Sequence, residues 1–376
     1  MGRVDAPLAL CAAALLLMIP ACVAPLMVVS TYGAVRQSWL PSSVLAMWRD
    51  GFPSLAVLVA TFSIALPVTF LGLLIWVLGG LHFGRLRGLG AAFRWVKHLR
   101  PWVMVEVYLV GCFVAYSRIK VISTVDVSIG GWCLIIGTMV LMLAITQLDD
   151  RTVWAALPGT ANEGDGAGVT GGARVEAGAK GTLACTVCDL ITVPRAQPQH
   201  CARCGARLHA RKPDAMRRTA AFVIAGYLLY IPANTLPVLT IVRFGREDPN
   251  TILSGVMELI HNHLWPLAVI VFAASIVLPL IKLFGLTWML IATRVKSRQL
   301  LVARTRLYRT IDIVGRWSNI DVFMVSVLVA ILQFGAVTAV HAGDGLVAFA
   351  AVVVITMIAT VFFDSRLMWD TGKAHD

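Results

Sequence analysis

The sequence predicts an all-α polytopic membrane protein built from two tandem four-helix transmembrane repeats, and three observations carry this prediction. The first is composition: 58% of the 376 residues are hydrophobic and 14% are charged, with a mean hydropathy of +0.80. A soluble globular chain of this length is less apolar. The others are a series of long apolar stretches and an internal repeat. The net charge of +12 does not indicate nucleic-acid binding, because most Lys and Arg residues lie in two short loops and one linker.

Eight apolar stretches are long enough to cross a bilayer core, which takes roughly 20 helical residues. They are expected at residues 7–29, 53–81, 101–117, 127–148, 219–242, 264–293, 317–340 and 345–363. Helices are favoured because each backbone amide in lipid needs a partner within its own segment, and the short alternating strands of a transmembrane barrel are missing. Further spans follow the first stretch, so we expect a retained helix rather than a cleaved signal peptide.

Basic residues predict the orientation of the spans, because loops rich in Arg and Lys mark the cytoplasmic side. Two loops, after the second and sixth stretches, carry Arg85, Arg87, Arg94, Lys97, Arg100, Arg294, Lys296, Arg298, Arg304, Arg306, Arg309 and Arg316. Both termini and the connector 149–218 are therefore expected in the cytoplasm. Segments 30–52, 118–126, 243–263 and 341–344 are expected on the outer side.

The chain repeats itself internally, at a shift of 212 residues that becomes 215 after a small insertion. The matches are Ile19-Pro20-Ala21 and Pro25 with Ile231-Pro232-Ala233 and Pro237, Leu66-Pro67 with Leu278-Pro279, Glu106 with Asp321, Asp149 with Asp364, and Trp154 with Trp369. Agreement over four spans predicts two related units. Since each unit has an even number of spans, a parallel pseudo-two-fold axis and a shared site at the interface are expected.

A Gly-rich segment separates the two repeats. Residues 158–182 are rich in Gly, Ala and Thr and cannot bury enough surface to fold, which predicts a flexible linker. The predicted organisation is an N-terminal transmembrane repeat at 1–157, the linker at 158–182, a small cysteine-rich ribbon at 183–212 and a C-terminal transmembrane repeat at 213–376.

The ribbon contains two C-x-x-C pairs separated by twelve residues. Their cysteines are Cys185, Cys188, Cys201 and Cys204. Such knuckles suit tetrahedral coordination of zinc by four thiolates. A thiol redox pair and two disulfides are the alternatives, but a cytoplasmic location disfavours disulfides, and two knuckles fit zinc better than a single redox motif. We therefore expect a cytoplasmic zinc ribbon whose metal is structural.

Charged residues inside the apolar stretches form a second candidate site, because a charge in lipid is costly unless it is paired or hydrated. Lys282 lies in the sixth stretch, Asp321 near the start of the seventh, and Glu106 at the equivalent place in the third. A Lys282–Asp321 ion pair is expected, within a polar network that carries protons. The hydroxyl residues that could extend this network are Ser275, Ser318 and Thr356. The alternative is a structural ion pair, or an acid solvated near the interface.

Paired prolines interrupt the outer parts of the first and fifth stretches. Proline breaks the helical hydrogen-bond ladder, so a hinge or a site lining is expected, with a simple packing kink as the alternative. The residues are Pro20, Pro25, Pro232, Asn234 and Pro237. Segments 38–50 and 250–263 are apolar but interrupted, which predicts amphipathic helices at the outer surface, where a partner could dock.

Taken together, these motifs resemble the paraquat-inducible protein A family over nearly the whole chain. The matching segments are the C-x-x-C…C-x-x-C-G ribbon, Ile231-Pro-Ala-Asn-Thr-Leu-Pro237, Leu278-Pro-Leu-Ile-Lys-Leu283, Trp317-Ser-Asn-Ile-Asp-Val-Phe323 and Phe362-Phe-Asp364. The resemblance implies an inner-membrane component that works with a periplasmic MCE-domain tunnel protein to move lipids between the two membranes of a Gram-negative envelope. It also implies that the C-terminal half holds a polar network of Lys282, Asp321, Thr356, Ser275 and Ser318.

The sequence departs from the family pattern in two places. Family members often carry a zinc ribbon before each half, whereas only Met1–Ala6 precede the first stretch here. In the N-terminal half, Phe70 stands where Lys282 stands in the C-terminal half. Proton-coupled machinery is therefore expected in the second half, with the first half as a scaffold or part of the lipid path.

The favoured function is a transporter subunit that loads lipid into, or receives it from, the tunnel protein, driven by proton movement through Lys282 and Asp321. No G-x4-G-K-[ST] phosphate loop occurs, so direct use of ATP is not expected, and no enzymatic activity is predicted. The alternatives are a passive membrane anchor for the tunnel protein and a zinc-thiolate redox or stress sensor.

Overall fold

The computed structural model describes residues 2–31, 34–84, 88–120, 123–157, 183–192, 200–201, 203–209, 211–243, 246–295, 299–332 and 338–370. The predicted linker 158–182 lies outside these residues. The chain divides into two compact units: unit 1 comprises residues 1–19, 66–103 and 135–213, and unit 2 comprises residues 20–65, 104–134 and 214–376. Unit 2 therefore contains elements from both halves of the sequence.

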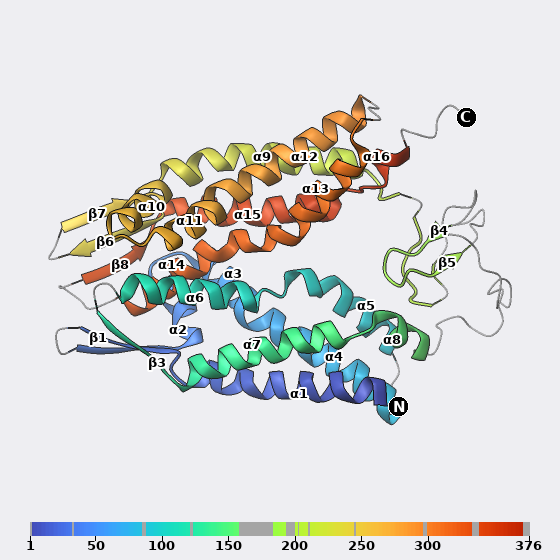
Figure 1. The fold of residues 1–376 in the computed structure, drawn as a ribbon, viewed down its shortest axis with the longest axis horizontal. Helices are drawn as coiled ribbons and strands as arrows, with labels where there is room; N and C mark the ends of the chain where they lie inside the picture. The colour runs from blue at the N-terminus through green and yellow to red at the C-terminus, as the bar shows by residue number, and fades with distance from the viewer. Residues whose placement is uncertain are drawn as a thin grey trace. The chain divides into compact units, whose positions relative to one another are not determined.

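The first half of the chain begins with a long helix and a β-hairpin, followed by a series of helices of different lengths (Figure 1). Its helices are α1 (Gly2–Val23), α2 (Leu40–Arg49), α3 (Pro53–Ala60), α4 (Leu66–Phe83), α5 (Leu89–Leu99), α6 (Val105–Ile119), α7 (Ile129–Gln147) and α8 (Asp150–Ala156). A π-helix, η1 (Thr61–Ala65), joins α3 to α4, and a 3-10 helix, η2 (Arg100–Trp102), lies between α5 and α6. The strands are β1 (Met27–Thr31), β2 (Ala34–Ser38) and β3 (Thr124–Val127).

The second half of the chain has the same order of elements. Its helices are α9 (Ala215–Thr235), α10 (Ile252–His261), α11 (Trp265–Phe272), π-helix η3 (Ala273–Val277), α12 (Leu278–Arg294), α13 (Leu301–Val314), 3-10 helix η4 (Gly315–Asn319), α14 (Ile320–Ile331), α15 (Asp344–Phe362) and α16 (Leu367–Asp370). Its strands are β6 (Leu239–Arg243), β7 (Arg246–Asn250) and β8 (Thr338–Ala342). Two short strands, β4 (Leu183–Ala184) and β5 (Ile191–Thr192), precede it.

Element boundaries in the two halves differ by a nearly constant shift. The starts of β1, α2, α3 and η1 lie 212 residues before those of β6, α10, α11 and η3, and the starts of α6 and α7 lie 215 residues before those of α14 and α15. These are the shifts at which the sequence matches itself.

Two three-stranded sheets interrupt the helices, in the orders β2-β1-β3 and β7-β6-β8. All pairings are antiparallel, with Met27 opposite Ser38 in one sheet and Leu239 opposite Asn250 in the other. The all-α prediction is therefore wrong at these places. The prediction that the helices continue to residues 29, 242 and 340 is also wrong. Each of these apolar stretches contains the end of a helix (α1, α9 or α14) and part of a following strand (β1, β6 or β8). Hydropathy does not distinguish helix from strand in so short a run.

The first helix of each half ends two residues before the second proline of its proline pair, Pro25 or Pro237. Helices α1 and α9 continue through Pro20 and Pro232 and end at Val23 and Thr235. The carbonyl oxygens of Pro25 and Pro237 then accept hydrogen bonds from the backbone N–H groups of Gly130 and Gly345, each at 3.0 Å. A Cβ at either glycine would lie within 3 Å of these carbonyls, so both turns need a residue without a side chain.

Seven helical runs among the described residues are long and apolar enough to cross a membrane. They are Asp5–Val23, Pro53–Phe83, Leu89–Ile119, Ile129–Gln147, Trp265–Arg294, Leu301–Ile331 and Asp344–Phe362. The remaining predicted span corresponds to α9, which has 21 residues and includes the polar residues Arg217, Arg218 and Asn234. The chain is a multi-pass membrane protein, and its eighth span stays a prediction.

The predicted amphipathic helices in the segments 38–50 and 250–263 are confirmed as α2 and α10. Helix α2 buries Leu40 and Met47, and exposes Trp48. Helix α10 is preceded by its N-cap residue Thr251, whose side chain accepts a hydrogen bond from the backbone N–H of Ser254 at 3.3 Å. Their location at the membrane surface stays a prediction.

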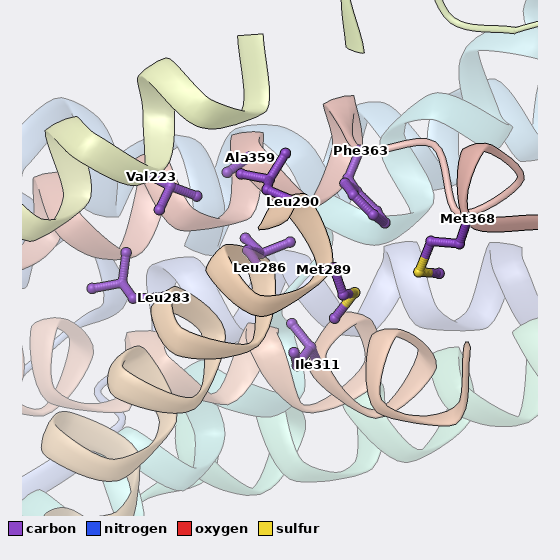
Figure 2. Packing of buried hydrophobic residues seen from close by; sticks show 9 residues of the cluster. All are labelled: Val223, Leu283, Leu286, Met289, Leu290, Ile311, Ala359, Phe363 and Met368. Atoms are coloured by element: carbon purple, nitrogen blue, oxygen red, sulfur yellow. The ribbon is translucent and has the colours of Figure 1, made fainter. Parts of the chain in front are cut away.

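Apolar side chains from α9, α12, α13, the end of α15, and α16 form a buried cluster in unit 2 (Figure 2). Helix α12 supplies Leu283, Leu286, Met289 and Leu290, which meet side chains of α9, α13 and the end of α15. The other members of the cluster are Val223, Ile311, Ala359, Phe363 and Met368. Lipid is as apolar as these side chains, so van der Waals packing rather than transfer from water stabilises this core.

Helices α6 and α14, one from each half of the sequence, also pack together in unit 2. The rings of Tyr108 and Phe323 meet edge to face with centroids 5.4 Å apart. A Cβ on Gly111 would lie 2.9 Å from the Cβ of Phe323, so the helices approach as closely as small residues permit.

Candidate functional site

Buried polar side chains gather where η3, α12, η4 and α14 pack in unit 2. Those of Ser275, Lys282, Ser318 and Asp321 are at most 3% exposed. They stand on helices that the sequence predicts to cross the membrane, so their polar groups require partners within the protein.

The π-helix η3 presents Ser275 to Asp321. Pro279 follows η3, lacks an N–H and cannot bond to the carbonyl of Ser275 four residues earlier. A wider π turn accommodates this missing bond, and such turns often mark functional sites. The Ser275 hydroxyl donates a hydrogen bond to Oδ2 of Asp321, and its Oγ also lies 2.5 Å from the carbonyl oxygen of Val271.

Lys282 bonds to the backbone of η4 and not to Asp321. Its Nζ donates to the carbonyl oxygen of Gly315 at 2.6 Å, and no oxygen of Asp321 lies within ion-pair distance. The predicted Lys282–Asp321 ion pair is therefore wrong. Lys282 lies seven residues beyond Ser275 on the same helical run, which is about 10 Å along the axis, whereas Asp321 faces Ser275.

Glu106 forms the ion pair that the sequence did not predict. Its Oε1 lies 3.3 Å from Nη1 of Arg316, and the two side chains are 18% and 33% exposed. Near the other end of η4, the Asn319 amide contacts the sulfur of Met104 at 3.1 Å. The start of α6 thus contacts both ends of η4.

The two remaining predicted hydroxyl residues have other surroundings. Thr356 is fully buried on α15 and donates to the carbonyl oxygen of Val353 at 2.9 Å, and a Cβ on Gly226 of α9 would meet its methyl carbon at 3.6 Å. Ser318 is fully buried, and its Oγ has no hydrogen-bond partner within the described part of the chain. The structure therefore joins Ser275 to Asp321 but does not bond Thr356 or Ser318 to either.

Arg118, at the end of α6, is a cation near this group. Its charge acts on the carboxylates of Asp321 and Glu258. The guanidinium occupies the space beside Gly255 of α10, where an added Cβ would lie 3.7 Å from Nη2. Arg118 thus comes from a helix of the first half, whereas both acids belong to the second.

The predicted hinge prolines lie at the ends of α1 and α9. Asn234 donates from its side chain to the carbonyl oxygen of Tyr230 at 2.9 Å, within the turn that contains Pro232. Because the helix continues through Pro232, the break falls at Pro237.

The four cysteines of the ribbon come together in unit 1. Their sulfur atoms all lie within 4.8 Å of one another, and all four side chains are buried. The Sγ atoms of Cys185 and Cys204 are 3.5 Å apart and those of Cys188 and Cys201 are 3.4 Å apart, with no disulfide among them. Four thiolates around zinc at about 2.3 Å are spaced by about 3.8 Å, so the arrangement fits a tetrahedral metal site.

Both knuckles have the same backbone geometry. The backbone N–H of Cys185 donates to Leu190 at 2.9 Å, and that of Cys201 donates to Ala206 at 2.8 Å. The residue after each second cysteine, Asp189 or Gly205, has a positive φ. Hydrogen bonds from Cys188 and Cys201 hold the pKa of Cys185 well below its usual value.

One contact within unit 1 joins the ribbon to helix α5. Nη1 of Arg94 donates to the carbonyl oxygen of Cys204 at 3.3 Å. On the same helix, Lys97 pairs with Asp150 of α8 at 2.5 Å. The basic loop thus contacts both the ribbon and the short helix that follows α7.

A cavity of about 190 Å³ in unit 1 is separate from both groups of residues. It is lined by Pro7, Leu78, Gln147, Leu148, Asp149, Thr152 and Val153. Asp149 accepts hydrogen bonds from the Thr152 hydroxyl and from the backbone N–H of Arg151, which lower its pKa. Its side chain is thus a helix N-cap for α8.

Sequence reasoning missed three features of the site. The sequence indicates only a basic loop residue at Arg316, although Arg316 pairs with Glu106. The two π-helices were not predicted, yet Leu66-Pro67 and Leu278-Pro279 recur at the places where they end. Nothing in the sequence indicates the role of Gly315, because only the fold brings Lys282 to its carbonyl oxygen.

Comparison with known proteins matches the chain to the family model described as paraquat-inducible protein A, over residues 4–158 and 216–372. The intermembrane transport protein PqiA of Escherichia coli (strain K12) is 32% identical over 278 residues, which cover 72% of this chain and 64% of that protein. Lipophilic envelope-spanning tunnel protein A of the same strain is 27% identical over 283 residues, covering 74% of this chain and 62% of that protein.

A probable intermembrane transport protein of Haemophilus influenzae is 24% identical over 351 residues, which cover 92% of this chain and 81% of that protein. The matches to the two Escherichia coli proteins span less than two thirds of their length. No solved structure matches the chain.

Proposed function

Since the chain belongs to the paraquat-inducible protein A family, we propose that it is an inner-membrane subunit of an intermembrane lipid-transport system. Relatives named as intermembrane transport proteins support a transport role. Seven apolar helical runs support a location in the membrane. We propose a periplasmic MCE-domain tunnel protein as the partner that gives lipid to this subunit or takes lipid from it.

Two tandem repeats are supported by the recurrence of elements and by the packing of α6 on α14. Met104 contacts Asn319, and Tyr108 contacts Phe323. Both contacts join residues 215 positions apart, which are equivalent positions in the two halves. Such contacts arise between parallel, symmetry-related helices, and they favour a pseudo-two-fold axis that passes between α6 and α14.

The observation that carries the transport mechanism is the buried contact between Ser275 and Asp321 on membrane helices. A hydroxyl has one proton, so Ser275 can donate either to an ionised Asp321 or to Val271. When Asp321 takes up a proton, the acid can donate to Ser275, and Ser275 can donate to Val271. The hydrogen bonds of η3 therefore depend on whether Asp321 holds a proton.

Buried oxygens without protein partners support a hydrated path beside this contact. They are Oδ1 of Asp321, Oγ of Ser318, Oδ1 of Asn319 and Oε2 of Glu106, counted within the described residues. Buried polar atoms of this kind are usually satisfied by water. We infer that protons reach Asp321 through such water, and that Lys282, held by Gly315, is the basic group of the same half.

Zinc is the proposed metal of the ribbon, with Cys185, Cys188, Cys201 and Cys204 as its ligands. Four thiolates leave no open coordination position, so the metal is structural. The proposed orientation places the ribbon and both termini in the cytoplasm, on the same side as the basic loop that contains Arg94.

A passive membrane anchor is the main alternative, because it also needs membrane helices and a partner surface. It differs in one respect: an anchor does not require charge at Lys282 or Asp321. A redox sensor differs again, since it would require the cysteine thiols to react.

The test is lipid exchange and survival of envelope stress in cells that carry Lys282→Ala or Asp321→Asn, after normal membrane levels and partner binding are confirmed. We expect each variant to lose at least about tenfold in exchange, because neither new side chain can exchange a proton. Lys97→Ala is the matched control, since it removes a basic side chain from a pair outside the membrane group.

Unchanged exchange in both variants would reject the charge-dependent mechanism and favour the anchor. Loss in both variants but not in the control, with partner binding intact, supports the transporter.

A further inference from the structure

Glu106 and Met104, at the start of α6, contact the 3-10 helix η4 at two points. Glu106 pairs with Arg316, the second residue of η4, at 3.3 Å. Met104 contacts Asn319, its last residue, at 3.1 Å. A segment from the first half of the sequence therefore contacts η4, which belongs to the second half, near both of its ends.

The same 3-10 helix holds Lys282. Nζ of Lys282 donates to the carbonyl oxygen of Gly315 at 2.6 Å, and Gly315 directly precedes Arg316. A Cβ on Gly315 would lie 2.9 Å from Cε of Lys282, so the lysine lies against the η4 backbone. A shift of η4 would change the only hydrogen bond of Lys282 within the described part of the chain.

The first half of the chain lacks the residues that would form the equivalent arrangement. In the first half, Phe70 stands at the position of Lys282, Arg100 at that of Gly315 and Pro101 at that of Arg316. Glu106 pairs with Arg316. The equivalent pair in the other direction would join Asp321 to Pro101, which has no charge. The pair of Glu106 with Arg316 therefore has no counterpart between Asp321 and Pro101.

We propose that Glu106 is a positioning residue for Lys282: through Arg316 it holds η4, and so the Gly315 carbonyl, against the lysine ammonium. This inference rests on the proposed function, because it assumes that Lys282 takes part in transport. It assigns the first half of the chain a part in the charge-dependent step, beyond that of a scaffold.

The local structure makes this arrangement sensitive to small changes. A 3-10 helix has poorer hydrogen-bond geometry than an α-helix, and a 3-10 segment within a longer helical run often marks a hinge. The pair is only partly exposed, with 18% of the Glu106 side chain and 33% of the Arg316 side chain accessible. Water therefore screens it less than a fully exposed pair.

The experiment compares four forms of the full chain in cells with its native partner: the unaltered protein, Glu106→Gln, Arg316→Gln, and the double variant with both changes. The readout is transfer of a fluorescently labelled phospholipid between the two membranes, measured as a function of pH. Asp150→Asn is the matched control, because Asp150 forms a similarly exposed ion pair with Lys97 in unit 1.

We expect both single variants and the double variant to lose between about threefold and thirtyfold in transfer rate, with an altered pH profile, while Asp150→Asn keeps the profile of the unaltered protein. The double variant is the decisive form. Removing both partners of an ion pair leaves no uncompensated charge, so a purely structural pair predicts recovery in the double variant, and recovery would overturn the proposal.

Lys282→Ala separates this inference from the proposed function. If Lys282→Ala abolishes transfer but Glu106→Gln and Arg316→Gln leave rate and pH profile unchanged, the positioning role is rejected and the transport mechanism stands. If Lys282→Ala has no effect, the charge-dependent mechanism itself is rejected. A double variant Glu106→Gln with Lys282→Ala should be no slower than Lys282→Ala alone, since Glu106 acts through the lysine.

Discussion

Two serines at equivalent positions show how one neighbour changes the role of a side chain. Ser63 in η1 and Ser275 in η3 are both buried, and each lies close to the carbonyl oxygen four residues earlier, at 2.7 Å and 2.5 Å. Ser275 also bonds to Asp321, whereas the acid equivalent to Asp321 is Glu106, which pairs with Arg316. The same local structure thus contributes only to packing in the first half, whereas in the second half it forms part of a polar site.

Ser275→Ala tests this difference, with Ser63→Ala as the matched control. Removing the Ser275 hydroxyl leaves a buried carboxylate oxygen without its donor, which costs about 1–3 kcal/mol of unfolding free energy. Ser63→Ala loses only a bond to a carbonyl of its own helix, which contributes little to helix stability, so we expect a smaller cost than for Ser275→Ala. Thermal unfolding in detergent and lipid exchange measure both effects. Equal losses in the two variants would contradict a special role for Ser275.

At the scale of elements, we expect the stability of the ribbon to depend on the proposed metal more than on packing. Its two strands, β4 and β5, have two residues each, and hydrogen bonds within each knuckle hold only a few residues. A structure of this size has too small a core to be stable without a metal or another cross-link.

Removal of the metal should therefore unfold the ribbon and leave the membrane helices intact. We expect purified protein to contain one zinc ion per chain, and a strong chelator or Cys185→Ser to make residues 183–207 sensitive to protease. Zinc content is measured by elemental analysis and cleavage by mass spectrometry. Protection that persists after complete zinc loss would contradict a structural metal, and Cys133→Ser, a cysteine outside the cluster, is the control.

At the scale of the whole molecule, the distribution of basic residues predicts the orientation, and the internal repeat predicts the number of spans. Basic residues follow α4 and α12, at equivalent places in the two halves. Helices α2 and α10 precede them, also at equivalent places. If each half has four spans, both halves enter the membrane in the same sense, and the eighth span must be α9.

Reporter fusions test this topology. Green fluorescent protein fused after Phe83 or Arg294 should fluoresce, because the positive-inside rule places these sites in the cytoplasm. Alkaline phosphatase fused after Asp50 or Asn262 should be active, because enzyme exported to the periplasm folds there. Opposite results at equivalent sites of the two halves would show that α9 does not cross the membrane and that the two halves are inverted.

Membrane character, the repeat and the cysteine cluster could all be read from the sequence. Each rests on a local pattern: apolar runs set by the bilayer, a constant shift between matching residues, and C-x-x-C spacing set by tetrahedral thiolate geometry. The buried acid and lysine were also found this way, because a charge in an apolar run is conspicuous in any sequence.

The hydrogen-bond partners of the buried polar groups could not be predicted from the sequence, because they depend on the fold. Hydropathy places Lys282 and Asp321 at similar depth. In the structure Lys282 lies about two helical turns beyond Ser275 on the same helical run, and Asp321 bonds to Ser275 whereas Lys282 bonds to Gly315. Such pairings depend on helix register and rotation, which packing decides and composition does not. For the same reason the strands after the prolines and the pair of Glu106 with Arg316 became visible only in three dimensions.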